Sequence, residues 1–299
     1  MITVDINSLS RHFPVNLTET LLLMGTEDMQ EIRIISEKTV SVQKSGILLD
    51  TGVRISRQEL KKIVDSMCRN SLYAMQTSLV KGYITLGGGH RAGICGRVVT
   101  ENGVITHMTD ISSMCIRVSR EIIGAADPIM EYLECNGRIY NTLVISPPGG
   151  GKTTLLRDIS RQLGERHKVC IADERSEIAA CRDGVPMHDV GRFTSVMDAV
   201  PKAEGIRMLL RTMSPEIIIT DETGSEEEEK AICQMINCGV KIITSAHGYS
   251  EKDLLNKELF GRLISRGVFE RIFVLGVRNK KISVEKIITD GRRIATCLS

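Results

Sequence analysis

The chain has 299 residues, of which 42% are hydrophobic and 25% charged, as in ordinary soluble globular proteins. Lysine and arginine number 39 against 37 aspartate and glutamate residues, and only 3% of residues are aromatic. This composition argues against a protein that holds nucleic acid through phosphate contacts and base stacking. The length allows two domains, each with its own core.

The cysteines and the first residues bear on the compartment. Nine cysteines include no CxxC pair, so the sequence predicts neither a disulfide framework nor a zinc site. The first residues, MITVDINSLSRHF, lack the basic-then-apolar layout of a signal peptide. No stretch approaches the ~18 apolar residues of a membrane span. We expect a cytoplasmic protein without direct membrane insertion, which could still dock on a membrane protein.

Residues 1–124 are predicted to form a small α+β domain. Ser56, with Glu59 three residues later, makes a capping box at the start of an amphipathic helix, whole or broken, that reaches about Leu79. A short helix is predicted over residues 17–24. The predicted strands cover residues 32–35, 39–42, 83–86, 92–100, 104–108 and 114–118.

Three arginines of this domain are candidates for a role at a nucleotide. Arg91 follows a run of three glycines and His90, while Arg117 and Arg120 lie in CIRVSRE just before the domain boundary. As neutralisers of γ-phosphate charge they would act as arginine fingers do. A glycine-rich hairpin bend with surface arginines explains the same residues. Residues 125–136, with a short helix over 128–133, are the predicted hinge.

Residues 137–299 are predicted to begin with a phosphate-binding P-loop, NTLVISPPGGGKTTLLR. An apolar strand over 142–145 precedes the glycines, and a helix follows them. Lys152 would reach the β and γ phosphates, and the Thr153 hydroxyl would bind Mg²⁺. Ser146 stands where the usual Walker A pattern has its first glycine, and the alternative is a Gly/Pro linker. The predicted nucleotide-binding residues are Pro148, Gly149, Gly150, Gly151, Lys152, Thr153 and Thr154.

Strands and helices alternate after the P-loop, with strands predicted over residues 169–172, 216–220 and 240–244 and a helix over 201–213. Repeated β–α units with polar residues at the strand ends predict a parallel sheet with its site at the carboxyl edge. The acidic run at 226–229 is interpreted as the first turn of a helix capped by Ser225, because acids there favour the helix dipole.

Asp221 and Glu222 follow an apolar strand, as a Walker B pair does. We assign Asp221 to the Mg²⁺ shell through water and Glu222 to activation of the attacking water. Asp173, Glu174 and Glu177 follow another strand, where a surface loop with ordinary ion pairs is the alternative. His247 could sense the γ-phosphate, although a lone histidine is more often structural.

These motifs resemble the secretion-superfamily ATPases, the motors of type II and type IV secretion and of type IV pili. DERSEI at 173–178 resembles their Asp box, with Glu174 and Glu177 on its acidic positions. ITDETG at 219–224 resembles their Walker B motif, with Glu222 on the catalytic glutamate, and TSAHG at 244–248 resembles their His box. The resemblance implies a RecA-like ATPase domain with a parallel-strand core behind a small α+β domain, ATP and Mg²⁺ as ligands, and hexameric rings.

Within that superfamily, several stretches between residues 83 and 248 resemble a sporulation ATPase of endospore-forming bacteria. They are GGGHRAGICGRV, ISSMCIRVSRE, ISPPGGGKTTLLRD, ADERSEIAA and PKAEGIRMLLRTMSPEIIITDE. The resemblance implies an ATPase of the mother-cell cytoplasm that works with membrane proteins of the same sporulation complex. That complex would be a channel or secretion apparatus between mother cell and forespore.

Two other functions fit a P-loop. A P-loop kinase or small-molecule NTPase would need a lid and an acceptor pocket, and the sequence has no arginine-rich lid segment. A RecA-like nucleic-acid-binding ATPase would need more positive charge and more aromatic residues than this chain has.

Overall fold

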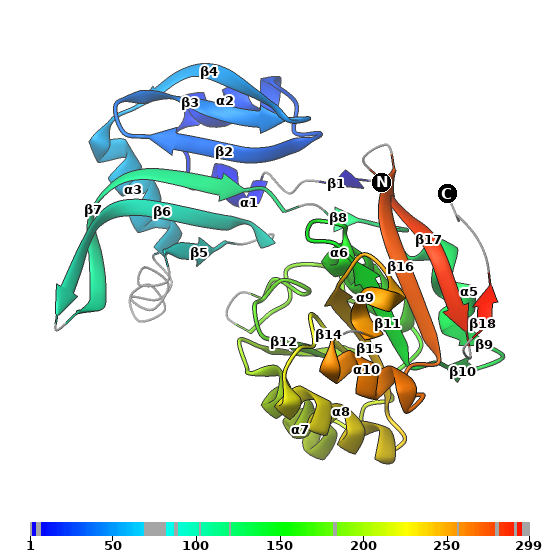
Figure 1. Ribbon diagram of the computed structural model, residues 1–299. Coiled ribbons are helices and arrows are strands. Elements are labelled where there is room, and N and C mark those ends of the chain that lie inside the picture. The colour runs from blue at the N-terminus through cyan, green and yellow to red at the C-terminus, as the bar shows by residue number, and fades with distance from the viewer. Residues whose placement is uncertain are drawn as a thin grey trace. The chain divides into compact units, whose positions relative to one another are not determined.

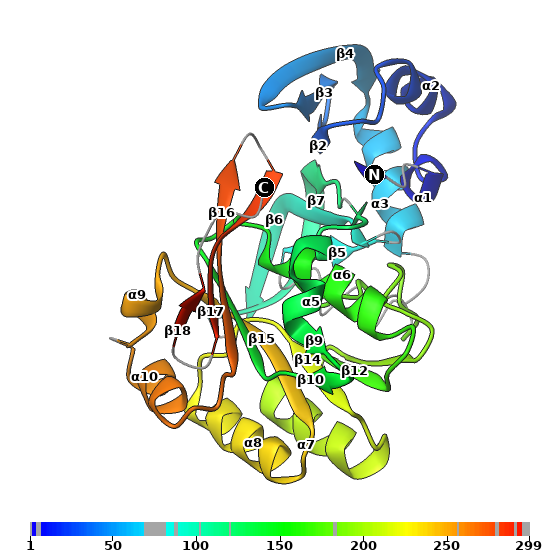
Figure 2. The ribbon, with the colours of Figure 1, turned by 90° about the vertical axis from the view of Figure 1, so that its right-hand side faces the viewer.

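The chain divides into two compact units, Ile2–Glu121 and Ile122–Ser299 (Figures 1 and 2). The structure is a computed structural model that describes residues 2–3, 7–68, 82–86, 89–101, 103–119, 121–181, 184–255, 257–278, 281–289 and 292–294. The three-part division at residues 124 and 136, with a hinge between, stays a prediction.

The N-terminal unit is built on a six-stranded antiparallel sheet with the order β4-β3-β2-β7-β6-β5. Its core joins sheet residues such as Ile32 and Ile116 to Leu17 and Leu60 of the helices. The strands are β1 (Ile2–Thr3), β2 (Met29–Ile35), β3 (Lys38–Lys44), β4 (Ile47–Ile55), β5 (Tyr83–Thr85), β6 (Arg91–Glu101) and β7 (Val104–Arg117), and the helices are α1 (Asn7–Ser10), α2 (Val15–Leu23) and α3 (Arg57–Cys68).

The capping box at the start of α3 is present. The Ser56 amide donates to Glu59 Oε2 at 2.8 Å, and the Glu59 amide donates to Ser56 Oγ at 3.2 Å. The predicted continuation of this helix to Leu79 lies outside the described residues. The two strands predicted over 104–108 and 114–118 are wrong as separate strands. They form the single strand β7, which tolerates the left-handed Asp110 (φ 45°) because its register against β6 shifts.

The second unit contains an eight-stranded sheet with the order β13-β12-β14-β15-β11-β16-β17-β18. The first six strands are parallel and the last two antiparallel, which confirms the predicted parallel-strand core. The strands are β11 (Thr142–Ser146), β12 (Val169–Asp173), β13 (Thr194–Asp198), β14 (Ile217–Thr220), β15 (Lys241–His247), β16 (Arg271–Arg278), β17 (Lys281–Thr289) and β18 (Arg292–Ile294). Three shorter strands are β8 (Glu121–Ile122), β9 (Glu134–Cys135) and β10 (Arg138–Ile139).

Helices pack against both faces of this sheet, so its central strands are buried almost along their whole length. Val144 of β11 packs with Leu155 and Ile159 of α6, whereas Leu143 and Ile145 belong to the core on the opposite face, with α7, α8 and α10. The helices are α5 (Met130–Leu133) after a 3₁₀ turn (Asp127–Ile129), α6 (Lys152–Leu163), α7 (Lys202–Thr212), α8 (Glu226–Asn237), α9 (Glu251–Leu255) and α10 (Glu258–Ser265).

The predicted hinge segment packs into this unit. Ala126, Ile129 and Leu133 are buried in the same cluster as Leu155 of α6. The Ala126 amide also donates to the buried Asp158 carboxylate of α6 at 2.8 Å. Residues 126–133 are therefore held firmly against the helix that follows the P-loop.

Among the helices of the described residues, none is long and apolar enough to cross a bilayer.

Native-state alkylation should divide the cysteines by burial. Every cysteine in the described part of the chain is a free thiol. Burial raises the pKa of Cys68 and of Cys170 to about 11 and that of Cys181 to about 12, whereas Cys95, Cys135 and Cys238 are exposed. Because the thiolate is the nucleophile, iodoacetamide at pH 8 should label the exposed three first and the buried three only in denaturant. Peptide mass spectrometry measures this order, and equal labelling without denaturant would contradict the packing.

Candidate active site

The polar residues predicted to act together lie at one edge of the parallel sheet. The P-loop follows β11, and Ser146 at the end of β11 pairs in register with His247 at the end of β15. On the other side of β15 lies β14, whose last residue, Thr220, precedes Asp221 and Glu222. The carboxyl ends of parallel strands meet at one edge, and that brings the three motifs together.

The glycines of the P-loop adopt the conformations that this loop requires. Gly149 (φ 73°) and Gly151 (φ 88°) are left-handed, and Gly151 is the N-cap of α6. At Gly150 a Cβ atom would overlap Ser146 Oγ, so a larger residue would force the Ser146 side chain to move. The loop thus delivers a helix N-terminus and closely packed backbone, the features of a phosphate site.

Serine at the first Walker A position is accommodated without a left-handed turn. Ser146 is fully buried and continues β11 as its last residue. Its Oγ donates to the Pro147 carbonyl at 2.8 Å and fills the space beside Gly150. The residue at this position therefore keeps an extended strand conformation, which serine adopts without strain.

Lys152 is buried at the start of α6. Its Nζ donates to the carbonyls of Ser146 (3.3 Å) and Pro147 (3.4 Å) and lies 2.9 Å from His247 Nδ1. Burial lowers the pKa of Lys152, while Glu222 and then Asp221 oppose that shift. The Lys152 ammonium group thus lies against the P-loop carbonyls and close to the carboxylates of Glu222 and Asp221.

His247 joins Lys152 to Glu222. Its Nε2 lies 2.6 Å from Glu222 Oε1, on the side of the ring opposite to Lys152. Because an ammonium can only donate, the network assigns Nδ1 as an acceptor and places the ring proton on Nε2, facing the carboxylate. Because His247 contacts both residues, a change in the position of the Lys152 ammonium can alter the hydrogen bonding of Glu222 through the His247 ring.

Asp221 is held by two hydroxyl groups. Thr153 Oγ1 donates to Asp221 Oδ2 at 2.9 Å, and Ser245 Oγ donates to Oδ1 at 2.5 Å. The same Ser245 hydroxyl accepts the Glu222 amide at 3.1 Å. Asp221 and the first hydroxyl residue of α6 thus form one group of oxygen donors.

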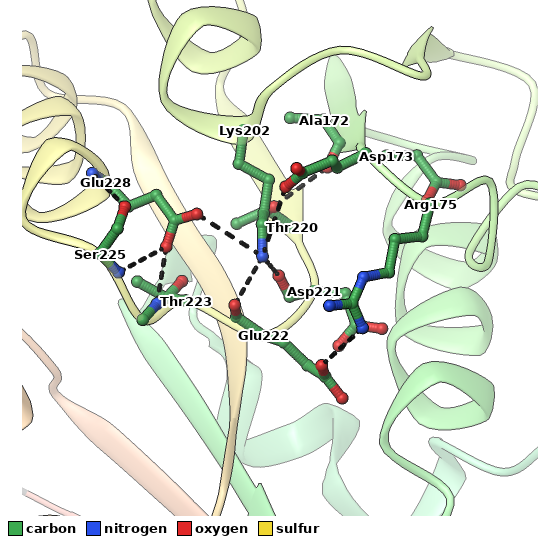
Figure 3. Close-up of polar contacts among 12 residues, drawn as sticks. Ala172, Asp173, Arg175, Lys202, Thr220, Asp221, Glu222, Thr223, Ser225 and Glu228 are labelled. Atoms are coloured by element: carbon green, nitrogen blue, oxygen red, sulfur yellow. Dashed lines mark hydrogen bonds and ion pairs between the residues drawn. The ribbon is translucent and has the colours of Figure 1, made fainter. Parts of the chain in front are cut away.

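Glu222 has an unusual backbone for a residue with a side chain. Its φ of 44° lies in the left-handed region, where strain is typical of functional sites. Its second carboxylate oxygen accepts from Arg175 Nη1 at 3.2 Å, as Figure 3 shows. A cavity of about 500 Å³ borders Glu222 and His247 and extends to Lys257 and Phe260.

The acidic residues after β12 have different roles. Asp173 is buried, and its carboxylate accepts the amides of Glu177, Ile178 and Ala179 at 2.9–3.0 Å. Burial raises the pKa of Asp173, and these hydrogen bonds counteract the rise. Glu174 is half-exposed and lies 3.8 Å from Lys202 Nζ. Asp173 therefore closes the loop, while Glu174 faces outward beside Lys202.

The sequence of residues 10–294 matches the profile of the protein family described as Sporulation stage III, protein AA. The chain belongs to this family. It is 40% identical over 254 residues to Stage III sporulation protein AA of Bacillus subtilis (strain 168), an alignment that covers 83% of this chain and 82% of the relative.

Solved structures show which fold this family member has. The X-ray structure of the Legionella pneumophila ATPase DotB superimposes with a TM-score of 0.57 and 19% identity, covering 95% of this chain and 80% of DotB. The pilus retraction motor PilT with bound ADP gives 0.63 and 14%, covering 95% and 82%. The predicted RecA-like fold, with a parallel-strand core preceded by a smaller α+β domain, is therefore confirmed for this sporulation family member. The structure adds that the sheet of the smaller domain is antiparallel.

The candidate arginines lie in the N-terminal unit. Arg91 and Arg117 are partners across β6 and β7, with Arg91 stacked over the Tyr83 ring at 4.7 Å. Arg117 Nε lies 3.8 Å from Glu31 Oε1, and its side chain is 76% exposed. Arg120 falls outside the described residues. The structure thus groups two of the three arginines on one sheet.

The interpretation of the acidic run at the start of α8 is confirmed. Ser225 Oγ accepts the Glu228 amide at 3.3 Å, and Glu228 Oε2 accepts the Ser225 amide at 3.0 Å. These acids cap a helix, as the sequence indicated.

Sequence reasoning missed three residues of this site as individuals. Ser245 lies inside the TSAHG motif, in which the sequence indicated a role only for His247. Arg175 lies inside DERSEI, in which the sequence indicated roles only for acidic residues. Lys202 follows a proline at the start of α7, inside the stretch PKAEG, where no role was assigned to the lysine. All three act through contacts between residues 20 to 47 positions apart in the chain, a range that periodicity does not reach.

Proposed function

We propose that this protein is a Mg²⁺-dependent ATPase of the secretion-motor type that energises a sporulation-specific membrane complex between mother cell and forespore. The observation that carries the proposal is the joining of Lys152, His247 and Glu222 in one network beside the P-loop. Membership of the sporulation family and a fold shared with the ATPase DotB and the motor PilT support it.

The loop residues fit the triphosphate of ATP. Left-handed Gly149 and Gly151 and the bare Gly150 let backbone amides approach a phosphate chain, with Pro148 at the loop entrance and Thr154 one residue into α6. Lys152 would neutralise the β and γ phosphates. Its pKa is lowered by burial, and bound phosphate would favour the charged form.

Thr153 and Asp221 fit Mg²⁺, because a hydroxyl and a carboxylate are the hard oxygen ligands that this cation prefers. Thr153 would bind directly and Asp221 through water. When bound, the ion neutralises charge on the phosphate oxygens.

Glu222 would accept a proton from the attacking water, and His247 would register the γ-phosphate, since its ring contacts both Lys152 and Glu222. Glu174 would contribute from the Asp-box strand, where it lies beside Lys202. In this assignment Lys152 binds the nucleotide and Glu222 promotes its hydrolysis. Substitutions of the two residues should therefore separate nucleotide binding from turnover.

The active form would be a homo-oligomer, a hexameric ring in the mother-cell cytoplasm, peripheral to the membrane through proteins of the same complex. Nucleic acid is not an expected partner. Arg91, Arg117 or Arg120 of the N-terminal domain would supply positive charge to a nucleotide site, as arginine fingers do. Such completion between subunits would make activity depend on assembly.

The test is Mg²⁺-dependent ATP hydrolysis per subunit over a wide range of protein concentration. Specific activity should climb with concentration as subunits complete one another's sites. At least one of Arg91→Ala, Arg117→Ala and Arg120→Ala should remove that climb. Arg54→Ala should leave it unchanged, because Arg54 is an exposed arginine of the same unit, comparable to Arg117, and is paired with Glu37. Real but flat activity would contradict the ring and favour a kinase or small NTPase. The absence of ATP binding would contradict the ATPase itself.

A further inference from the structure

The peptide backbone around Glu222 is strained, and Lys202 lies against it. Glu222 has φ 44°, a conformation that costs energy for a residue with a Cβ atom and persists only where neighbouring groups hold it. The carbonyl oxygens of Asp221 and Glu222 both point to one ammonium group. Lys202 Nζ donates to them at 2.9 and 2.6 Å, as Figure 3 shows.

The amide side of the same turn is held from another strand. Ser245 Oγ accepts the Glu222 amide at 3.1 Å, and the Ser245 carbonyl accepts the Thr223 amide at 3.1 Å. β15 therefore fixes the N–H groups of this turn, while Lys202 fixes its carbonyl groups. With both sides bonded, the turn has little freedom to relax to an ordinary conformation.

Lys202 is itself firmly placed. Its side chain is only 11% exposed. Lys202 is the first residue of α7, and this helix packs against β12, where Gly205 lies beside Ala172. An ammonium has three protons. Two serve the carbonyls, and the rest of the group faces Glu228 Oε1 at 3.6 Å and Glu174 Oε2 at 3.8 Å. The positive charge is thus balanced by the Glu174 carboxylate from the loop after β12 and by the Glu228 carboxylate at the start of α8, of which Figure 3 labels Glu228.

We propose that Lys202 is a positioning residue for ATP hydrolysis, which holds the backbone of Glu222 so that its carboxylate stays beside His247. This inference rests on the function proposed above. Lys202 acts through Glu222 and takes no proton itself, so it should affect turnover rather than nucleotide affinity. It also gives Glu174 a role, since this acidic residue helps to balance the charge on Lys202.

The experiment is a double-mutant cycle on the full chain, with kcat and KM for Mg²⁺-ATP and a separate Kd for ATP. Lys202→Met should lower kcat about tenfold or more and leave Kd within about twofold. In the Glu222→Gln background the same change should alter the residual rate by less than about twofold, because the group that Lys202 positions is already disabled. Lys230→Met is the matched control, since Lys230 is an exposed lysine of α8 paired with Glu227, and it should match the wild type.

Three results would overturn the inference alone. The first is an unchanged kcat in Lys202→Met. The second is a Kd for ATP that rises in Lys202→Met by the same factor as kcat falls. The third is a double variant whose fold-decrease in kcat equals the product of the fold-decreases of the two single variants. A Glu222→Gln variant with full turnover would instead overturn the proposed function, and this inference with it. If Lys202→Met fails to fold, Lys202→Arg takes its place in the cycle. It keeps the charge facing Glu174 and Glu228, but its longer, planar guanidinium cannot occupy the position of the ammonium between the two carbonyls, so a lower kcat and the same non-additivity are expected.

Discussion

Replacing Lys152 by alanine should abolish nucleotide binding, with Kd for ATP raised about 100-fold or more. The side chain is buried at the start of α6 with its ammonium over the P-loop, and phosphate binding there depends on a point charge at that position. Titration with a fluorescent ATP analogue measures the loss. Lys230→Ala is the control, since this exposed lysine of α8 pairs only at the surface with Glu227. Wild-type affinity in Lys152→Ala would contradict the P-loop assignment.

Lys152→Ala should also differ from the wild type in how the free energy of unfolding depends on pH. Burial lowers the pKa of Lys152 below its unfolded value of 10.5, so between the two pKa values the unfolded chain binds more protons than the folded one. The free energy of unfolding of the wild type should therefore rise with pH across that window, relative to Lys152→Ala. ATP affinity of the wild type should fall over the same window, because the ammonium form is the one that binds phosphate.

Replacing Glu222 by glutamine should preserve ATP binding and lower kcat about 10²- to 10³-fold, the range of a lost general base. Glutamine keeps the shape of the side chain, and its one carbonyl oxygen can still accept from His247 or from Arg175, but it cannot accept the proton of water. Single-turnover hydrolysis together with equilibrium binding separates the two effects.

The matched control for this variant is Glu226→Gln. Glu226 is an exposed carboxylate of the first turn of α8 and borders the same cavity as Glu222. Its loss should change kcat less than about twofold. If Glu222→Gln loses binding as completely as Lys152→Ala does, then Glu222 shapes the binding site and the role assigned to it is wrong.

Local sequence determined the parts of this protein that depend on neighbours along the chain. The P-loop could be predicted because strand, glycines, lysine and helix lie within 17 residues, and the capping boxes at Ser56 and Ser225 because each spans four residues. Apolar runs of four or five residues predicted the buried parallel strands, since such runs are typical of strands in a sheet covered on both faces. Together these signals predicted the fold class and which strand ends carry the site.

Tertiary structure decided what those residues do to one another. The left-handed turn at Glu222, the Ser245 hydroxyl shared by Asp221 and Glu222, and the Lys202 contacts all join elements far apart in sequence. Periodicity and propensity describe what a segment prefers by itself, and they carry no information on which side chain fills the space beside a strained turn. That choice is made when α7, β14 and β15 pack together, and only the folded chain shows it.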